Sequence, residues 1–264
     1  MYRKAVNILI LITILIPIAI LMIWAFSARW PWPQVFPRNF SLRGFENLMR
    51  QPNQLLTLIL SSVFISSCVA MLSCMIALMT ARAMVMAKGF FKNFIQLTIA
   101  LPFLIPVIVF ATGIHQKMIE WGWANKLCGV IFVHLIYSLP YASYLVIDAY
   151  HAVGLHLEEQ AWILGANKWK AFWKITFPLL LPVLATSLAM SFIVSFSQYF
   201  LTLMIGGGKI QTLSVIIYPY LQRNDRTIAS IYALFFLIIS FLVMGLFSWF
   251  SKYYQRKYEK VDFY

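Results

Sequence analysis

The segment Glu158–Pro178 reads EEQAWILGANKWKAFWKITFP, and it decides how the rest of the chain is interpreted. It is charged and rich in tryptophan, whereas long apolar runs lie on both sides of it. Its two leading glutamates suit the positive end of a helix. Gly165 can adopt the left-handed conformation that ends a helix, and Asn167 is a good N-cap for another. The sequence therefore predicts two short helices joined by a glycine elbow within residues 156–177.

The end of this segment predicts a change of direction. Proline disfavours the helical conformation for the residue before it. Pro178 is therefore expected to force Phe177 out of the helix and to turn the chain into the next apolar run.

The apolar runs around the segment are long enough to cross a membrane. Of the 264 residues, 62% are hydrophobic and 11% are charged, a balance that excludes a water-soluble domain. A helix needs about 20 apolar residues to cross a bilayer. We predict an all-α membrane protein with six transmembrane helices in a single domain, residues 1–264. The expected spans are 6–26, 55–81, 94–114, 127–149, 178–205 and 228–250.

Charge predicts the orientation of these spans. A net charge of +13 is compatible with nucleic-acid binding, but excess lysine and arginine in a membrane protein usually mark its cytoplasmic side. We therefore expect no nucleic-acid partner, a lipid bilayer around the chain, and both termini in the cytoplasm. The basic residues assigned to the cytoplasm are Arg3, Lys4, Arg82, Lys88, Lys92, Lys168, Lys170, Lys174, Lys252, Arg256, Lys257 and Lys260. The external ones are Arg29, Arg38, Arg43, Arg50, Lys117, Lys126, Lys209, Arg223 and Arg226.

Prolines and a short apolar segment modify the simple pattern. Pro102, Pro106, Pro140 and Pro182 fall inside expected spans and are expected to kink them. The apolar stretch Thr212–Leu221 is too short to cross a bilayer, which favours an external re-entrant or interfacial segment.

Several kinds of chemical site are not indicated. Cys68, Cys74 and Cys128 form no CxxC pair, which argues against a disulfide or zinc site. The GGGK at 206–209 lacks the spacing of a phosphate-binding loop. No cluster of catalytic side chains is present, so we expect no enzyme activity and no cofactor bound by this chain.

The tryptophans of the segment leave two explanations open. Trp162, Ala166, Trp169 and Trp173 follow one another at helical spacing and form an apolar stripe. Such a stripe suits an amphipathic helix lying among lipid headgroups. It equally suits a surface on which a soluble partner docks.

The same segment resembles the signature of a known family. Glu159-Gln160-Ala161, Gly165, Ile175 and Phe177-Pro178 match the E-A-A-x-x-x-G-x9-I-x-L-P pattern of binding-protein-dependent (type I) ABC importer permeases, the EAA-loop family. Glutamine replaces the first alanine and phenylalanine replaces the leucine. The stretches SLPYASYLV (138–146) and SFSQYFLTLMIGGG (195–208) extend the resemblance towards spermidine/putrescine, thiamine, iron and phosphonate permeases.

The resemblance implies a fold, a location and partners. The fold would be the type I ABC importer permease (MetI-like) fold, in a bacterial plasma (inner) membrane. The chain would form half of a translocation pore with a second permease subunit, and an external solute-binding protein would deliver the solute. An ATPase dimer on the cytoplasmic side would bind ATP and Mg. The residues that would couple the pore to this ATPase are Glu159, Ala161, Gly165, Ile175 and Pro178.

The resemblance also implies a substrate class, a polyamine, thiamine, a phosphonate or a similar small solute. Ser197-Gln198-Tyr199 stands where polyamine permeases often carry acidic residues, which weakens the polyamine assignment.

The fifth span carries a polar stripe. Ser187, Ser191, Ser195, Gln198 and Thr202 recur at helical spacing, so one face of the helix is polar. In a membrane such a face points at protein or water. Helix packing and lining of the translocation path both explain it. The path would involve Ser191, Ser195, Gln198, Tyr199 and Thr202.

A transporter driven by an ion gradient is the alternative function. Such proteins usually carry ionisable residues inside the membrane. Only His134 lies in the middle of an expected span.

Overall fold

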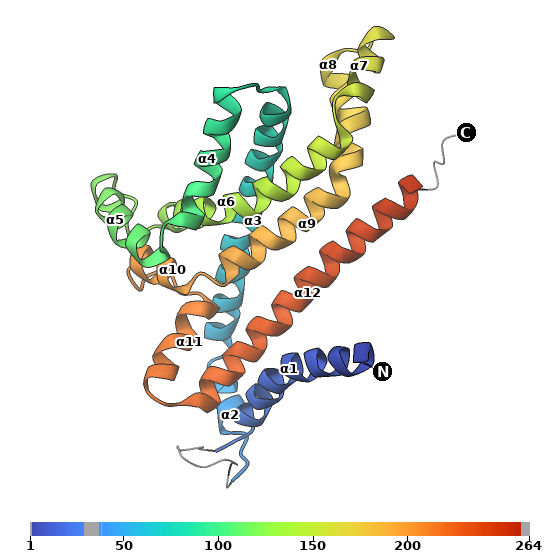
Figure 1. Cartoon of the computed structure of the whole chain (residues 1–264). Coiled ribbons are helices and arrows are strands. Elements are labelled where there is room, and N and C mark those ends of the chain that lie inside the picture. Colours follow the sequence, from blue (N-terminus) through green and yellow to red (C-terminus); the bar gives the residue numbers. More distant parts are fainter. Residues whose placement is uncertain (1, 29–36, 38, 260–264) are drawn as a thin grey trace. The chain divides into compact units, whose positions relative to one another are not determined.

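The computed structural model describes residues 2–28, 37 and 39–259, and all its regular elements within these ranges are helices. Figure 1 shows them in chain order. Arg29, Arg38 and Lys260, assigned above to loops and to the C-terminus, lie outside the described residues. The helices are α1 (Tyr2–Ala25), α2 (Arg43–Arg50), α3 (Pro52–Met86), α4 (Phe90–Leu104), α5 (Val107–Glu120), α6 (Leu127–Val153), α7 (His156–Ile163), α8 (Lys168–Ala171), the π-helix η1 (Phe172–Thr176), α9 (Phe177–Phe196), α10 (Tyr199–Gly206), α11 (Leu213–Gln222) and α12 (Arg226–Glu259).

Length and composition identify the helices that could cross a membrane. Four qualify among the described residues, within α3, α6, α8–α9 and α12. The pair α4 and α5 qualifies only as one bent span. The first expected span, 6–26, coincides with α1, a helix of 24 residues. The multi-pass helical architecture is thereby confirmed.

Two of the expected continuous spans are broken. The span expected over 94–114 divides at Ile105–Pro106, where the chain bends by 104° between α4 and α5. The proline lacks a backbone N–H, and the residue before it takes an extended conformation, so the helix stops instead of kinking. The span expected over 178–205 ends at Phe196, and α10 begins only at Tyr199. Both spans were wrongly predicted as single helices.

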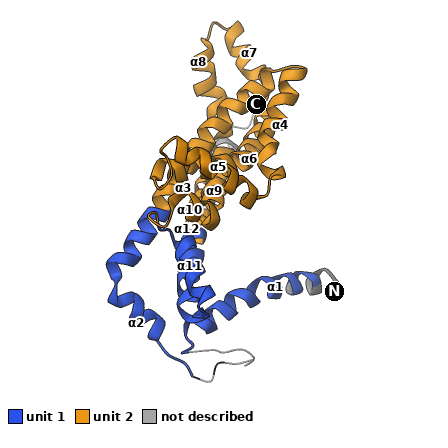
Figure 2. Cartoon of the chain, turned by 90° about the vertical axis from the view of Figure 1, so that its left-hand side faces the viewer, with its two compact units in different colours: residues 1–62, 211–240 blue, residues 63–210, 241–264 orange. Residues whose placement is uncertain are grey.

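The chain divides into two compact units (Figure 2). The first comprises residues 1–62 and 211–240. In it, Arg43 on α2 pairs with Asp225 at 2.7 Å, and Thr227 donates a hydrogen bond to the Ser27 carbonyl. The Ser62 hydroxyl accepts the backbone N–H of Leu213, at the start of α11. That the whole chain forms one permease domain stays a prediction.

The second unit comprises residues 63–210 and 241–264 and contains the charged segment Glu158–Pro178. Its central element pair is α6 and α9, which pack along each other (Figure 1). Val146, Tyr150, Leu180 and Leu184 form part of one core between them, joined by Ala77 of α3. A second core joins α3, α5, α6 and α10 through Ile65, Met118, Val130, Leu201 and Ile205.

The ends of this unit can be told apart. Asn125, just before α6, donates its backbone N–H to Ile205 of α10, so these two elements meet at one end. At the other end α6 leads into α7, and α9 begins after α8. Ser251 of α12 donates to the Pro182 carbonyl near the start of α9. The loop after α3, the α7–α8 segment and the last part of α12 therefore lie toward one end.

Candidate functional site

The helices α7 and α8 form a hairpin, residues 156–171, with an elbow at Gly165. The Gly165 N–H donates to the Trp162 carbonyl and the Ala166 N–H donates to the Ala161 carbonyl. These two bonds form a Schellman motif, which requires a left-handed residue after the helix end. Gly165 has a φ of 85°, and a Cβ there would touch nothing within 4 Å. Its backbone conformation, not the space around it, therefore requires glycine.

The second arm of the hairpin begins at the predicted N-cap, but the chain after it stays helical where a turn was predicted. The Asn167 side chain accepts a hydrogen bond from the Trp169 N–H at 3.1 Å, which confirms it as the N-cap of α8. The turn expected at Pro178 is wrong, because Phe177 is helical, with φ −60° and ψ −45°. The chain passes from α8 through η1 into α9, and Pro178 lies in the first turn of α9. A first turn needs no N–H from that residue, so proline is tolerated there.

The tip of the hairpin exposes large apolar side chains. Ile163 is 85% exposed, Leu164 is 88% exposed and Trp169 is 69% exposed. Trp162 and Ala166, which the sequence placed on the same apolar stripe, are half-buried. Neither Ile163 nor Leu164 belongs to the apolar stripe that the sequence predicted. Contiguous exposed apolar side chains mark surfaces that contact a partner or a membrane.

The structure brings only part of the expected coupling set together. Glu159 is exposed on α7, Ala161 is half-buried on the same helix, and Gly165 forms the elbow. Ile175 lies in η1 and Pro178 in α9, and both are half-buried. The first three thus belong to the hairpin, and the last two to the helix that follows it.

A carboxylate that sequence reasoning treated only as a helix-start residue forms the centre of a polar network. Glu158 is fully buried. Its oxygens accept hydrogen bonds from Arg82 Nη2 at 3.0 Å, Tyr150 Oη at 3.4 Å and Thr176 Oγ1 at 2.5 Å. The Arg82 guanidinium also lies 4.6 Å from the centre of the Phe172 ring. Four elements, α3, α6, α7 and η1, therefore meet at one carboxylate.

The burial of this network makes it costly to disrupt. The Arg82 side chain is 27% exposed and that of Glu158 is 0% exposed. Removing one partner of a buried ion pair typically destabilises a protein by about 3–5 kcal/mol, because the other charge stays buried without compensation. A signal was present in the sequence, because Arg82 is charged at the end of an apolar run. Its distant partner was not identifiable from spacing.

A second polar cluster lies inside the helices. His134 of α6 is 1% exposed, and its Nδ1 and Nε2 lie 3.0 Å and 2.9 Å from the hydroxyls of Ser195 and Thr202. Thr202 donates its only hydroxyl proton to the Gln198 carbonyl at 2.6 Å, so it accepts from Nε2–H. The neutral ring then accepts the Ser195 proton at Nδ1. The cluster spans the break between α9 and α10.

The expected path residues lie around this cluster, on α9, on α10 and in the break between the two helices. Ser187, Ser191, Ser195 and Thr202 are all at most 2% exposed, whereas Gln198 and Tyr199 are half-buried. The stripe does not continue on one helix, because the helix stops between Ser195 and Gln198. In this conformation the buried members pack inside the chain.

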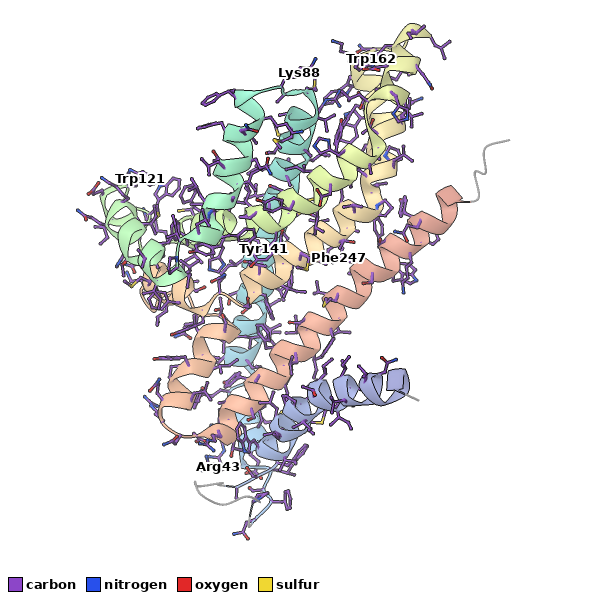
Figure 3. The ribbon with its side chains drawn as sticks, in the orientation of Figure 1. Arg43, Lys88, Trp121, Tyr141, Trp162 and Phe247 are labelled. Atoms are coloured by element: carbon purple, nitrogen blue, oxygen red, sulfur yellow. The ribbon has the colours of Figure 1, made fainter. Side chains whose placement is uncertain are left out.

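Figure 3 labels Trp162 on the hairpin, Lys88 in the α3–α4 turn and Tyr141 on α6. Among the described residues, no group of three or more His, Cys, Asp and Glu side chains could hold a metal ion. The three cysteines are unpaired by disulfides.

The long apolar helices and the exposed hairpin are those of a multi-pass membrane protein. The sequence model of the family described as "Binding-protein-dependent transport system inner membrane component" matches residues 73–256. The chain belongs to this family, the permease components of ABC importers.

Named relatives and solved structures agree with this family. The chain is 28% identical over 168 residues to the "Probable sulfate transport system permease protein cysT" of Marchantia polymorpha, an alignment that covers 58% of each protein. The protein of the same name from Chlorokybus atmophyticus is 28% identical over 209 residues, which cover 67% of this chain and 73% of the relative. The match thus spans 58% of the length of the Marchantia relative.

The fold is shared with a solved transporter. A crystal structure of a bacterial ABC transporter involved in import of the acidic polysaccharide alginate aligns with a TM-score of 0.69 at 18% identity, over 95% of this chain and 94% of that one. A structure of the bacterial alginate ABC transporter in complex with its pentasaccharide-bound periplasmic protein aligns with a TM-score of 0.66 at 17% identity, over 97% of this chain and 93% of that one. The expected permease fold is confirmed.

Proposed function

We propose that this chain forms half of the pore of an ATP-driven importer, and that a separate ATPase subunit binds its α7–α8 hairpin. The hairpin supports this proposal most directly, because a glycine elbow presents Ile163 and Leu164 while Glu158 anchors its base. Exposed apolar side chains on a rigid support favour a protein partner over lipid headgroups. A solute-binding protein and a second permease chain complete the proposed assembly. Both chain termini would lie in the cytoplasm of a bacterial cell.

The proposed cycle is alternating access. ATP binding closes the ATPase dimer, and the movement reaches the pore through the hairpin. Hydrolysis then returns the pore to its inward-open state. ATP and Mg would be bound by the partner, and this chain would hold no cofactor and catalyse no reaction.

A substitution at the elbow tests the coupling. Gly165→Pro is expected to abolish both ATP-driven uptake and stimulation of the ATPase by substrate, because proline cannot adopt a positive φ and the two arms of the hairpin are redirected. Membrane insertion should be unchanged. The measurement is solute uptake and phosphate release in proteoliposomes that contain the complete complex.

The control for this test is Gly113→Ala on α5, where a Cβ would meet nothing within 4 Å and the helix gains a better helix former. Wild-type uptake by the Gly165→Pro complex would contradict the proposal. Failure of a tagged chain to co-purify with any ATP-hydrolysing subunit would contradict it as well.

We further propose that the substrate is an anion. The relatives reported above are named as probable sulfate transport permeases, and the structural neighbour is involved in the import of an acidic polysaccharide. Lys126 and Lys209 are exposed at the end of the second unit away from the hairpin, where an anion would be attracted. A polyamine, a polycation, would be repelled there. The positive charge disfavours a polyamine, and the names of the relatives favour sulfate over thiamine and over a phosphonate, which is also an anion.

Uptake measurements distinguish the substrates. Cells that express the transporter should accumulate labelled sulfate, and Lys126→Gln with Lys209→Gln should lower the uptake rate several-fold at low ionic strength, with less effect at high salt. The matched control is Lys88→Gln, at the hairpin end. ATP-dependent accumulation of spermidine without sulfate would contradict an anion as substrate.

The ion-coupled alternative has less structural support. The nitrogen of the neutral His134 ring that could take up a proton, Nδ1, accepts a hydrogen bond from Ser195, so its protonation would require that hydroxyl to turn round. Uptake that persists without ATP and collapses with the membrane potential would favour the alternative.

A further inference from the structure

The buried carboxylate of Glu158 carries an inference that rests on the proposed function and extends it. We propose that Arg82, Glu158 and Thr176, here named the clasp, make the α7–α8 hairpin move as one body with α3 and α6. The motion of the ATPase then reaches three helices, not only α9, to which the hairpin is covalently continuous. Glu158 and Arg82 are positioning residues in this scheme.

Covalent connections tie the hairpin directly to only some of its neighbours. The hairpin is joined covalently to α6 at one side and to η1 and α9 at the other. Gly154 interrupts the link to α6, with a φ of 68°. A link that contains such an interruption transmits little force unless a contact bridges it. Tyr150 of α6 and Glu158 of α7 lie on opposite sides of Gly154 and bridge it at 3.4 Å.

Helix α3 has no direct covalent link to the hairpin. Arg82 reaches Glu158 from α3 with two guanidinium nitrogens, at 3.0 Å and 3.5 Å. The same guanidinium lies over the Phe172 ring of η1. A planar guanidinium held at its edge and at its face has little freedom to rotate, so displacement of the hairpin displaces α3.

The clasp also holds the π-helical turn η1. A π-helix is rare, and it appears mostly as a single wide turn inside an α-helix, where it frequently marks a functional position. Here it lies between the hairpin and α9, on the covalent path from the hairpin to that helix. Thr176, its last residue, is buried and donates to Glu158. The clasp therefore closes across the wide turn and keeps it from extending.

The experiment measures coupling separately from folding. The complete complex in proteoliposomes gives the number of solute molecules imported per ATP hydrolysed. Arg82→Gln with Glu158→Gln removes both charges together, so neither remains buried alone and the complex should assemble. Import per ATP should fall about tenfold, which is typical of the loss of a coupling free energy between sites. ATP hydrolysis itself should persist.

Neutral changes at Thr176 provide an independent test that folding defects cannot imitate. Thr176→Val keeps the shape of the side chain but removes the hydroxyl, and it should lower import per ATP severalfold. Thr176→Ser keeps the hydroxyl and should restore the wild-type ratio. Glu120→Gln, which breaks the exposed Lys117–Glu120 pair, is the matched control and should change nothing.

Two outcomes would overturn the clasp. One is a wild-type import ratio in the Arg82→Gln, Glu158→Gln complex. The other is equal ratios for Thr176→Val and Thr176→Ser. If the unaltered complex itself imports nothing on ATP addition, the proposed function fails, and this result is distinct from failure of the clasp.

Discussion

At the scale of single residues, His134 shows how a polar side chain is accommodated inside an apolar helix bundle. Each ring nitrogen has a hydroxyl partner, and the tautomer follows from the direction of the Thr202 hydrogen bond. The sequence identified the histidine as isolated within a span, and it identified Ser195 and Thr202 as one polar stripe. It could not show that these groups meet, because His134 is separated from them by more than sixty residues.

Thr202 offers a clean test of this cluster. Thr202→Val removes the hydroxyl that accepts from His134, so the buried Nε2–H loses its partner at a cost of about 1–3 kcal/mol. The melting temperature of the purified chain in detergent should fall by several degrees. Thr202→Ser keeps the hydroxyl and should lie much closer to the wild type. Equal melting temperatures for the two variants would show that the contact does not stabilise the fold.

At the scale of elements, the sequence predicted where helices occur better than where they stop. The apolar runs located α3, α6, α9 and α12, because length and hydropathy are local properties. The break at Pro106 depends on a distant contact. The Tyr137 hydroxyl of α6 donates to the Ile105 carbonyl at 2.9 Å, which satisfies a group exposed by the end of α4. Without a partner of this kind, the prolines predicted only a kink.

Tyr137→Phe tests whether that contact stabilises the break. The phenyl ring keeps the edge contact with Phe110, at 5.2 Å between ring centres, while the hydrogen bond is lost. A net loss of about 1 kcal/mol is expected, and hydrogen exchange at the start of α5 should become faster. Tyr144→Phe on the same helix is the control. Faster exchange in the control alone would contradict the assignment.

The hairpin was predicted well because its signals are local. Gly165 and Asn167 both specify backbone conformations that a short sequence contains in full, and both were confirmed. The role of Pro178 was not predicted correctly, because the π-helical turn before it changes what proline does there. Glu158 could not be ranked above Glu159 from spacing alone. Only packing shows that one is buried and the other exposed.

At the scale of the whole molecule, orientation in the membrane is the main prediction to test. Within the second unit, Arg82, Lys88, Lys92, Lys168, Lys170, Lys174 and Lys252, which were assigned to the cytoplasm, lie toward one end. Single cysteines at Lys88 and Lys168, in a chain without its native cysteines, should react with an impermeant maleimide only when the cytoplasmic face is accessible.

Cysteines at Lys126 and Lys209 should react in intact cells, because the meeting of Asn125 with Ile205 places both loops at the opposite end. The paired labelling pattern, in intact cells and in inverted vesicles, is the measurement. Labelling of all four positions from one face would contradict the assignment of these loops to opposite faces, and labelling of the two pairs from exchanged faces would reverse the orientation.

The bare tip of the hairpin has a consequence for how the chain persists in a cell. Ile163 and Leu164 form an exposed apolar surface that proteases and chaperones recognise for as long as no partner covers it. We expect newly synthesised chains to be degraded quickly unless the partner ATPase subunit is produced at the same time. The half-life of the chain should therefore depend on the amount of that subunit. Abundance of this protein would then be set by pairing rather than by its own rate of synthesis.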